Sequence, residues 1–162
     1  MTLTPRHGGG VILITLLAAL VLSTLPLPDW AVEFRPEWPL LVLIYWSIAL
    51  PHRVGIGAFW IAGLLMDTLR GALLGQHALA YTLVGYICLR MHRIVRVYPL
   101  WQQALGVLAL LILEQWLLMW IRGLIGQTAS GWAVLMPAVT STLLWPWLFV
   151  ILRDLRRRFR VT

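Results

Sequence analysis

The chain has 162 residues, of which 60% are hydrophobic and only 12% are charged, and its mean hydropathy is +0.84. Soluble domains carry about 25% charged residues, so this composition excludes an ordinary soluble domain and predicts a single polytopic membrane domain over residues 1–162. All 13 basic residues are arginine, and the formal net charge is +7. In a soluble protein such an excess suggests nucleic acid, whereas in a membrane protein it records orientation, so we expect no nucleic-acid partner. Cys88 is the single cysteine, which rules out an intrachain disulfide and a cysteine metal cluster.

The first predicted helix covers the apolar run 11–27, which follows Arg6 and His7. A signal peptide has a similar pattern, but no small-x-small cleavage site follows this run, so we expect an uncleaved membrane helix. Residues 29–37 then form a short acidic loop bounded by prolines.

Two shorter apolar runs, 38–50 and 54–69, fall below the roughly 20 residues of a full span, so they are short spans or the legs of a hairpin. Pro51, His52 and Arg53 leave room only for a tight turn between them, which we place in the cytoplasm.

Three further predicted helices cover residues 73–89, 100–121 and 132–152, and a basic tail, 153–162, completes the chain. The run 100–121 is about 33 Å long as a helix, which is enough to cross a bilayer. The predicted fold is therefore an all-α integral membrane protein, a bundle of six transmembrane helices. The arginines of the tail anchor a helix end against anionic membrane lipids, or, as a second interpretation, bind a cytoplasmic protein.

The arginines predict the orientation of this bundle. Six crossings place alternate connections on opposite sides of the membrane. One side receives Arg6, Arg53, Arg90, Arg93, Arg96, Arg153, Arg156, Arg157, Arg158 and Arg160, and the other receives only Arg35, Arg70 and Arg122. Because arginines collect in short cytoplasmic loops, both termini are expected in the cytoplasm.

Gly63, Asp67 and Gly71 recur at every fourth residue, so they lie within about 80° of one face of the third helix. Glycines on a face let another backbone approach closely, which favours a packing face whose acid pairs with Arg70. The alternative is an ion or proton site, because acids inside membranes are often functional. Glycines at residues 71 and 75 also allow the helix to break there.

Glu114 lies 14 residues into the fifth helix, about 21 Å from its start. Gln115 beside it is expected to point elsewhere, and Arg122 is two turns away. Glu114 therefore needs a partner on another helix, a second protein or a proton. Structural satisfaction is the simpler interpretation, and a transport or docking role is the alternative.

No catalytic, metal or cofactor site is predicted. The histidines, at residues 7, 52, 77 and 92, show no HExxH or other i, i+4 pairing, and the chain contains no GxSxG motif or phosphate-binding loop. We therefore expect a protein that is not an enzyme.

Several short segments follow one another in a distinctive order: 34–38 (FRPEW), 43–46 (LIYW), 50–54 (LPHRV), the 63–71 stretch, 74–75 (LG), 100–105 (LWQQAL) and 144–147 (LWPW). Together they resemble one family, the rod shape-determining protein MreD. The resemblance implies a fold like the six-helix substrate-binding component of energy-coupling vitamin transporters. It also implies a non-enzymatic role in the elongation complex of the bacterial cytoplasmic (inner) membrane, in cell shape and the regulation of lateral peptidoglycan synthesis. The implied partners are MreC, the MreB filament (directly or through MreC), and a RodA-type glycosyltransferase with its transpeptidase.

On this basis we expect the membrane helix of MreC to dock on a face that contains Asp67 or Glu114. Two other functions stay open. The chain could be a small-molecule-binding membrane component of a transporter, or a proton-coupled or ion-conducting bundle that uses the same two acids.

Overall fold

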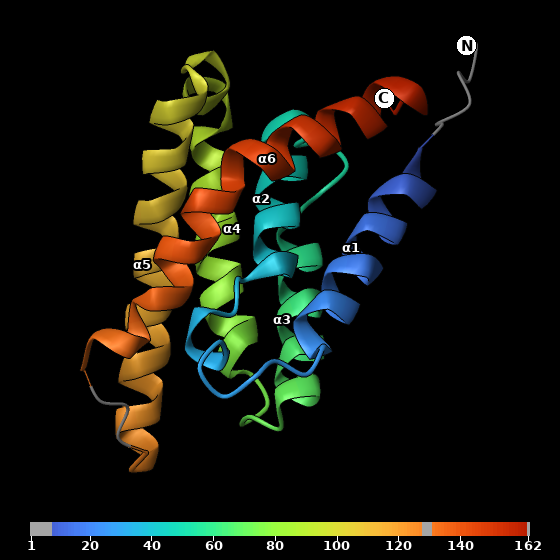
Figure 1. Cartoon of the computed structure of the whole chain (residues 1–162). Coiled ribbons are helices and arrows are strands. Elements are labelled where there is room, and N and C mark those ends of the chain that lie inside the picture. Colours follow the sequence, from blue (N-terminus) through green and yellow to red (C-terminus); the bar gives the residue numbers. More distant parts are fainter. Residues whose placement is uncertain (1–7, 128–130, 162) are drawn as a thin grey trace.

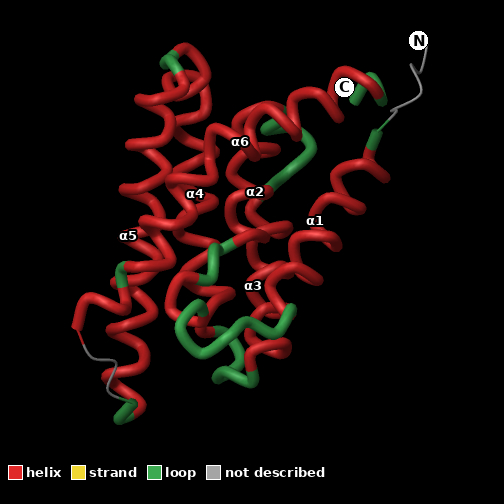
Figure 2. The backbone as a smooth tube through the Cα atoms, viewed as in Figure 1, coloured by secondary structure: helices red, strands yellow, loops and turns green. Residues whose placement is uncertain are grey.

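The computed structural model describes residues 8–127 and 131–161, and within these ranges it contains six α-helices and no strand (Figures 1 and 2). The expectation of an all-helical chain is therefore confirmed. The helices are α1 (Gly9–Thr24), α2 (Trp38–Ala49), α3 (Ile56–Arg70), α4 (Gln76–Val97), α5 (Leu100–Ile125) and α6 (Met136–Arg158). Two short 3-10 helices, η1 (Val32–Phe34) and η2 (Gly131–Val134), lie in the connections before α2 and α6.

Three helices extend further than the apolar runs suggested. Helix α4 continues to Val97, α5 continues to Ile125, and α6 includes most of the predicted basic tail as far as Arg158. Arginine is a good helix former, and cations in a last turn interact favourably with the helix dipole, so the loss of hydrophobicity at these points does not end the helix.

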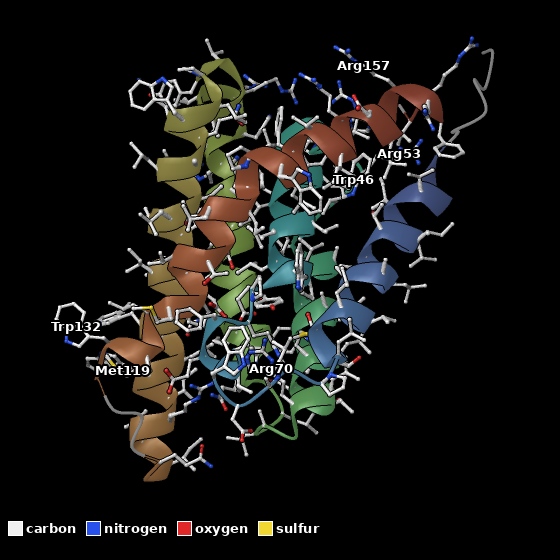
Figure 3. The ribbon with its side chains drawn as sticks, in the orientation of Figure 1. Trp46, Arg53, Arg70, Met119, Trp132 and Arg157 are labelled. Atoms are coloured by element: carbon white, nitrogen blue, oxygen red, sulfur yellow. The ribbon has the colours of Figure 1, made fainter. Side chains whose placement is uncertain are left out.

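Successive helices run in opposite directions (Figure 1). The start of α1, the α2–α3 and α4–α5 turns and the end of α6 lie at one end of the molecule, at the top of the view. We call it the arginine-rich end, because it carries Arg53, Arg90, Arg93, Arg96, Arg153, Arg156, Arg157, Arg158 and Arg160. The other end carries Arg35, Arg70 and Arg122 and is called the Arg70 end below. Figure 3 shows Arg53 and Arg157 at the first end and Arg70 toward the second.

Helix α2 is the centre of the bundle. Residues from Pro39 to Ile48 are all buried, and Trp46 is among the largest fully buried side chains. The indole nitrogen of Trp46 donates a hydrogen bond to Thr15 on α1 at 3.0 Å. At the other face, the guanidinium of Arg96 on α4 donates to the carbonyl of Ile48 at 2.7 Å. Arg96 thereby satisfies a carbonyl that the end of α2 would otherwise leave without a partner.

Helices α3 and α4 approach each other most closely, and two glycines make this possible. A Cβ atom at Gly63 would overlap the backbone of Ala78, and one at Gly85 would overlap the ring of Phe59. A close backbone contact of this kind is typical of helices packed inside membranes. It brings the last turns of α3 directly beside the first turn of α4.

The outer surface of the bundle is strongly apolar. Large hydrophobic side chains with more than half of their surface exposed include Ile14 on α1, Ile61 on α3, Leu105 on α5 and Leu143 on α6. Among the described helices, α5 and α6 are long and apolar enough to cross a bilayer on their own, and α1 is a shorter apolar helix. Surfaces of this kind suit a lipid environment.

Candidate functional site

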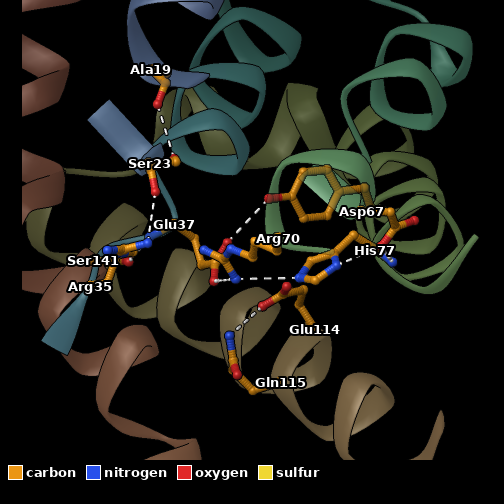
Figure 4. A network of polar contacts seen from close by, with 11 residues as sticks. Ala19, Ser23, Arg35, Glu37, Asp67, Arg70, His77, Glu114, Gln115 and Ser141 are labelled. Atoms are coloured by element: carbon orange, nitrogen blue, oxygen red, sulfur yellow. Dashed lines mark hydrogen bonds and ion pairs between the residues drawn. The ribbon is translucent and has the colours of Figure 1, made fainter. Parts of the chain in front are cut away.

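A buried network of charged and polar side chains links four helices near the Arg70 end, and Glu37 is its centre (Figure 4). Glu37 directly precedes α2, and its carboxylate is 1% exposed. One carboxylate oxygen accepts a hydrogen bond from Arg70 on α3 at 3.1 Å, and the other accepts one from the Tyr81 hydroxyl on α4 at 3.2 Å. The backbone N–H of Glu37 donates to the Ser141 hydroxyl on α6 at 2.9 Å. One residue therefore fixes the start of α2 to three other helices.

Asp67 performs a second structural task, because its carboxylate caps the N-terminus of α4. It accepts hydrogen bonds from the backbone N–H of Gly75 at 2.9 Å and of His77 at 2.8 Å. The first N–H groups of a helix have no partner inside the helix, and a carboxylate near them is also favoured by the helix dipole. Gly75 at the N-cap position has no side chain to supply this contact, so an acid from the neighbouring helix supplies it.

The predicted Asp67–Arg70 pair is therefore wrong. The two residues are neighbours on the surface of α3, but each one bonds to a different partner. The carboxylate of Asp67 is occupied by the start of α4 and by the His77 ring, while Arg70, in the last turn, extends to Glu37.

His77 connects Asp67 to the Arg70–Glu37 ion pair. Its Nδ1 lies 2.7 Å from Asp67, and its Nε2 lies 3.3 Å from a guanidinium nitrogen of Arg70. Because a guanidinium only donates hydrogen bonds, Nε2 accepts, and the hydrogen is assigned to Nδ1, where it is donated to Asp67. The result is a continuous chain of contacts through Asp67, His77, Arg70, Glu37 and Tyr81.

Although Asp67 and His77 form an Asp–His pair, their arrangement differs from the catalytic triad of a hydrolase. In a catalytic triad, the second ring nitrogen faces a serine or cysteine nucleophile. Here that place is taken by Arg70. Among the described residues, no group of three or more His, Cys, Asp or Glu side chains could hold a metal ion.

Glu114, on α5, is fully buried beside this network (Figure 4). One carboxylate oxygen accepts a 2.8 Å hydrogen bond from the amide of Gln115, and the other has no partner within the described ranges. The expectation that Gln115 points elsewhere is wrong, because both side chains are long enough to bend toward each other from adjacent positions. Like Asp67, Glu114 is 0% exposed, so neither carboxylate is presented on an outer face where a partner helix could touch it.

The remaining predicted site residues, Gly63, Gly71 and the turn 51–53, lie outside the buried network. Gly63 lies at the close contact with α4. Gly71 does not belong to a packing face. It follows the last residue of α3 with φ of 62°, in the left-handed region that favours glycine, and it ends the helix.

The turn of Pro51, His52 and Arg53 joins α2 to α3 at the arginine-rich end. The N–H of Arg53 donates to the carbonyl of Leu50 at 3.0 Å, as in a tight turn. This turn lies far from the buried network (Figure 3).

The sequence pattern missed four members of the network, namely Glu37, His77, Tyr81 and Ser141. The sequence pattern placed Glu37 only in the acidic loop 29–37, and His77 was considered only as a zinc ligand. A usable signal existed for His77, because it lies in the first turn of a helix, just after a glycine turn that follows an acid in an apolar run.

A family model described as rod shape-determining protein MreD matches residues 6–155, which is nearly the whole chain. The chain belongs to the MreD family. The chain is also 34% identical over 151 residues to the rod shape-determining protein MreD of Haemophilus influenzae, covering 91% of this chain and 93% of that protein. No solved structure matches the chain significantly.

Membership of the MreD family confirms the resemblance seen in the sequence. MreD proteins are membrane proteins that determine rod shape, and the family is structural and is not known as an enzyme family. The chain is thus a membrane protein with a role in cell shape. The apolar outer surface and the buried charges agree with this environment, because charged groups inside a membrane protein face the interior of the bundle.

Proposed function

We propose that the chain is a non-enzymatic scaffold of the bacterial elongation complex in the cytoplasmic membrane. In this role it contacts MreC and, through it or directly, the MreB filament, and it regulates a RodA-type glycosyltransferase and its transpeptidase. The observation that carries the proposal is the network around Glu37. The carboxylates, guanidinium and imidazole of this network join helices to one another. Helices joined in this way form a rigid body, which a scaffold needs in order to assemble other proteins.

All six helices cross the membrane in this proposal, with the arginine-rich end and both termini in the cytoplasm. Helices α2 and α3 have 12 and 15 residues, or about 18 and 22 Å, which is less than the roughly 30 Å hydrocarbon layer. The short length of α2 is tolerable because almost all of it is surrounded by protein, so it need not match the lipid. The alternation of the helix ends and the distribution of arginines support the orientation.

Docking of MreC depends on the network indirectly in this proposal. Asp67 and Glu114 are buried, so a partner helix touches the outer faces of the helices that these acids position. A change at Glu37 or Arg70 would shift α2, α3, α4 and α6 relative to one another and so disturb such a face.

Cell shape and MreC capture together test the proposal. Rod-shaped cells depleted of the protein should become round, wild-type protein should restore rods, and MreC should co-purify with it. We expect an Arg70→Met variant to fail in both assays, while Arg93→Met, a change of an exposed arginine at the other end, should behave as wild type. Rods and normal MreC yield in cells that contain only the Arg70→Met protein would contradict the proposal.

A second candidate, the small-molecule-binding component of a transporter, has one observation in its favour, an open cleft at the Arg70 end with a volume of about 1090 Å³. Loss of uptake of a defined compound on deletion, without a change of cell shape, would favour this function over the scaffold.

A further inference from the structure

A cleft of about 1090 Å³ opens at the Arg70 end of the bundle. It lies between the end of α1, the segment before α2, the α3–α4 turn and the end of α5. We call it the arginine cleft, because all three arginines of this end line it: Arg35, Arg70 and Arg122. Gln76 and the exposed apolar side chains of Leu73 and Ile125 are also part of its wall.

The cleft contains hydrogen-bond donors that the protein itself does not satisfy. Gln76, the first residue of α4, is 4% exposed, and its side-chain nitrogen Nε2 has no hydrogen-bond partner within the described ranges. Arg35 donates to the carbonyls of Ser23 and Leu25, both at 2.9 Å, but its buried Nε has no partner in the same part of the chain. The guanidinium of Arg122, in the last turn of α5, is half-buried and makes neither a hydrogen bond nor a salt bridge with the described residues. A buried donor without a partner is costly, so the side chains of Gln76 and Arg35 indicate a missing acceptor, and the Arg122 guanidinium is available to bind the same acceptor.

The charge of the cleft defines the kind of acceptor. Three arginines face a single carboxylate, that of Glu37, so the charged side chains in the wall sum to +2 (three minus one). Both oxygens of Glu37 are already engaged by Arg70 and Tyr81. His77 adds no charge, since its Nε2 accepts from Arg70. An anion that accepts several hydrogen bonds at once would satisfy the free donors, and phosphate oxygens are suited to arginine in this way.

We propose that the arginine cleft binds the phosphate of an anionic membrane lipid, held between Arg122 and Gln76. Both contacting groups lie at helix ends: Arg122 in the last turn of α5 and Gln76 in the first turn of α4. In a bundle that spans the membrane, helix ends lie at the depth of the headgroups, where lipid phosphates are found. The side chains of Leu69, Leu73 and Ile125 in the wall are 49%, 60% and 44% exposed, and they provide an apolar surface for the acyl chains.

The test measures lipid binding to the purified full-length protein in detergent, by native mass spectrometry and by thermal unfolding. Phosphatidylglycerol, inorganic phosphate and diacylglycerol are compared, since they carry phosphate with acyl chains, phosphate alone and acyl chains alone. Wild-type protein should bind phosphatidylglycerol and be stabilised by it, and diacylglycerol should have no effect. Arg122→Gln and Gln76→Leu should each weaken phosphatidylglycerol binding about tenfold, the loss expected for one charge-assisted hydrogen bond. Arg93→Gln, which removes an exposed arginine at the arginine-rich end, is the matched control and should bind as wild type.

Equal binding of phosphatidylglycerol by wild type, Arg122→Gln and Gln76→Leu would overturn the proposal. A loss of binding in Arg93→Gln as large as in Arg122→Gln would also overturn it, because the lipid would then be held by nonspecific electrostatic attraction. An acidic peptide is measured in the same assays, and its binding without any binding of phosphate or phospholipid would also overturn the proposal. If inorganic phosphate binds as tightly as phosphatidylglycerol and its binding depends on Arg122, the cleft is a phosphate site. The proposal that its ligand is a lipid would then be overturned. If Arg122→Gln does not fold, Arg122→Lys keeps the charge and should bind with intermediate affinity. The cleft shares Glu37 and Arg70 with the buried network, but Arg122 and Gln76 make no contact in that network, so MreC capture measured on the Arg122→Gln and Gln76→Leu variants separates the two proposals.

Discussion

At the scale of single residues, the Asp67 side chain stabilises the start of α4. Its two oxygens accept hydrogen bonds from Gly75, from Ala78 at 3.4 Å, and from both the backbone and the ring of His77. A buried acid is expensive unless such partners compensate it, and here they belong to the next helix. The same arrangement explains how glycine can occupy the N-cap of α4 without leaving its N–H groups unsatisfied.

Replacing Asp67 with asparagine should destabilise the protein by about 1–3 kcal/mol, because the amide presents one acceptor oxygen where the carboxylate presents two charged ones. The free energy of unfolding in detergent would measure this, with Asp154→Asn as the control. Asp154 is exposed at the arginine-rich end, so its change should have almost no effect. An equal loss of stability in both variants would show that Asp67 does not cap α4.

At the scale of helix pairs, the close contact between α3 and α4 contributes to the stability of the fold. Gly63→Ala should destabilise by about 1–3 kcal/mol, because its methyl group would overlap the backbone of Ala78 and force the helices apart. Gly57→Ala on the same helix is the matched control. Its Cβ meets nothing within 4 Å, so alanine should stabilise α3 by up to about 1 kcal/mol. Thermal unfolding of the two variants in the same detergent checks the prediction, and it fails if Gly63→Ala is as stable as Gly57→Ala.

The Glu37–Arg70 pair joins α2 to α3, and a double-mutant cycle can isolate it. Arg70→Met should cost about 3–5 kcal/mol, because it leaves the Glu37 carboxylate buried without its cation. Adding Glu37→Gln removes that charge, so the double variant should recover much of the stability. Unfolding free energies of the two single variants and the double variant give the coupling. Additive losses would mean that the two side chains do not interact as described.

The sequence predicted the helices better than their contacts. Long apolar runs predicted six helices, and glycines at positions 71 and 75 indicated the break between α3 and α4. Helix ends were misplaced where arginine replaced apolar residues, because arginine continues a helix without adding hydrophobicity. The partner of Asp67 was missed because the sequence pattern favoured a residue one turn away, whereas the chain folds back at residue 71 and brings His77 closer. Ser141 lies 104 residues from Glu37, and no local pattern could connect them.

On the scale of the whole molecule, the two ends have different chemistry. The arginine-rich end carries exposed cations on the last turns of α4 and on the end of α6, while the Arg70 end contains the buried network and the arginine cleft. If the first end faces the cytoplasm, the cleft opens to the outer leaflet of the membrane. The scaffold and the lipid site would then address opposite sides of the bilayer, so the orientation of the bundle underlies both proposals.

Accessibility labelling of single cysteines tests this orientation most directly. In a Cys88→Ser background, Glu33→Cys places a thiol in the exposed connection at the Arg70 end, and Arg158→Cys places one at the exposed end of α6. A membrane-impermeant maleimide should label position 33 in intact spheroplasts and position 158 only after the membrane is permeabilised. Labelling of position 158 in intact spheroplasts, with position 33 protected until permeabilisation, would contradict the account.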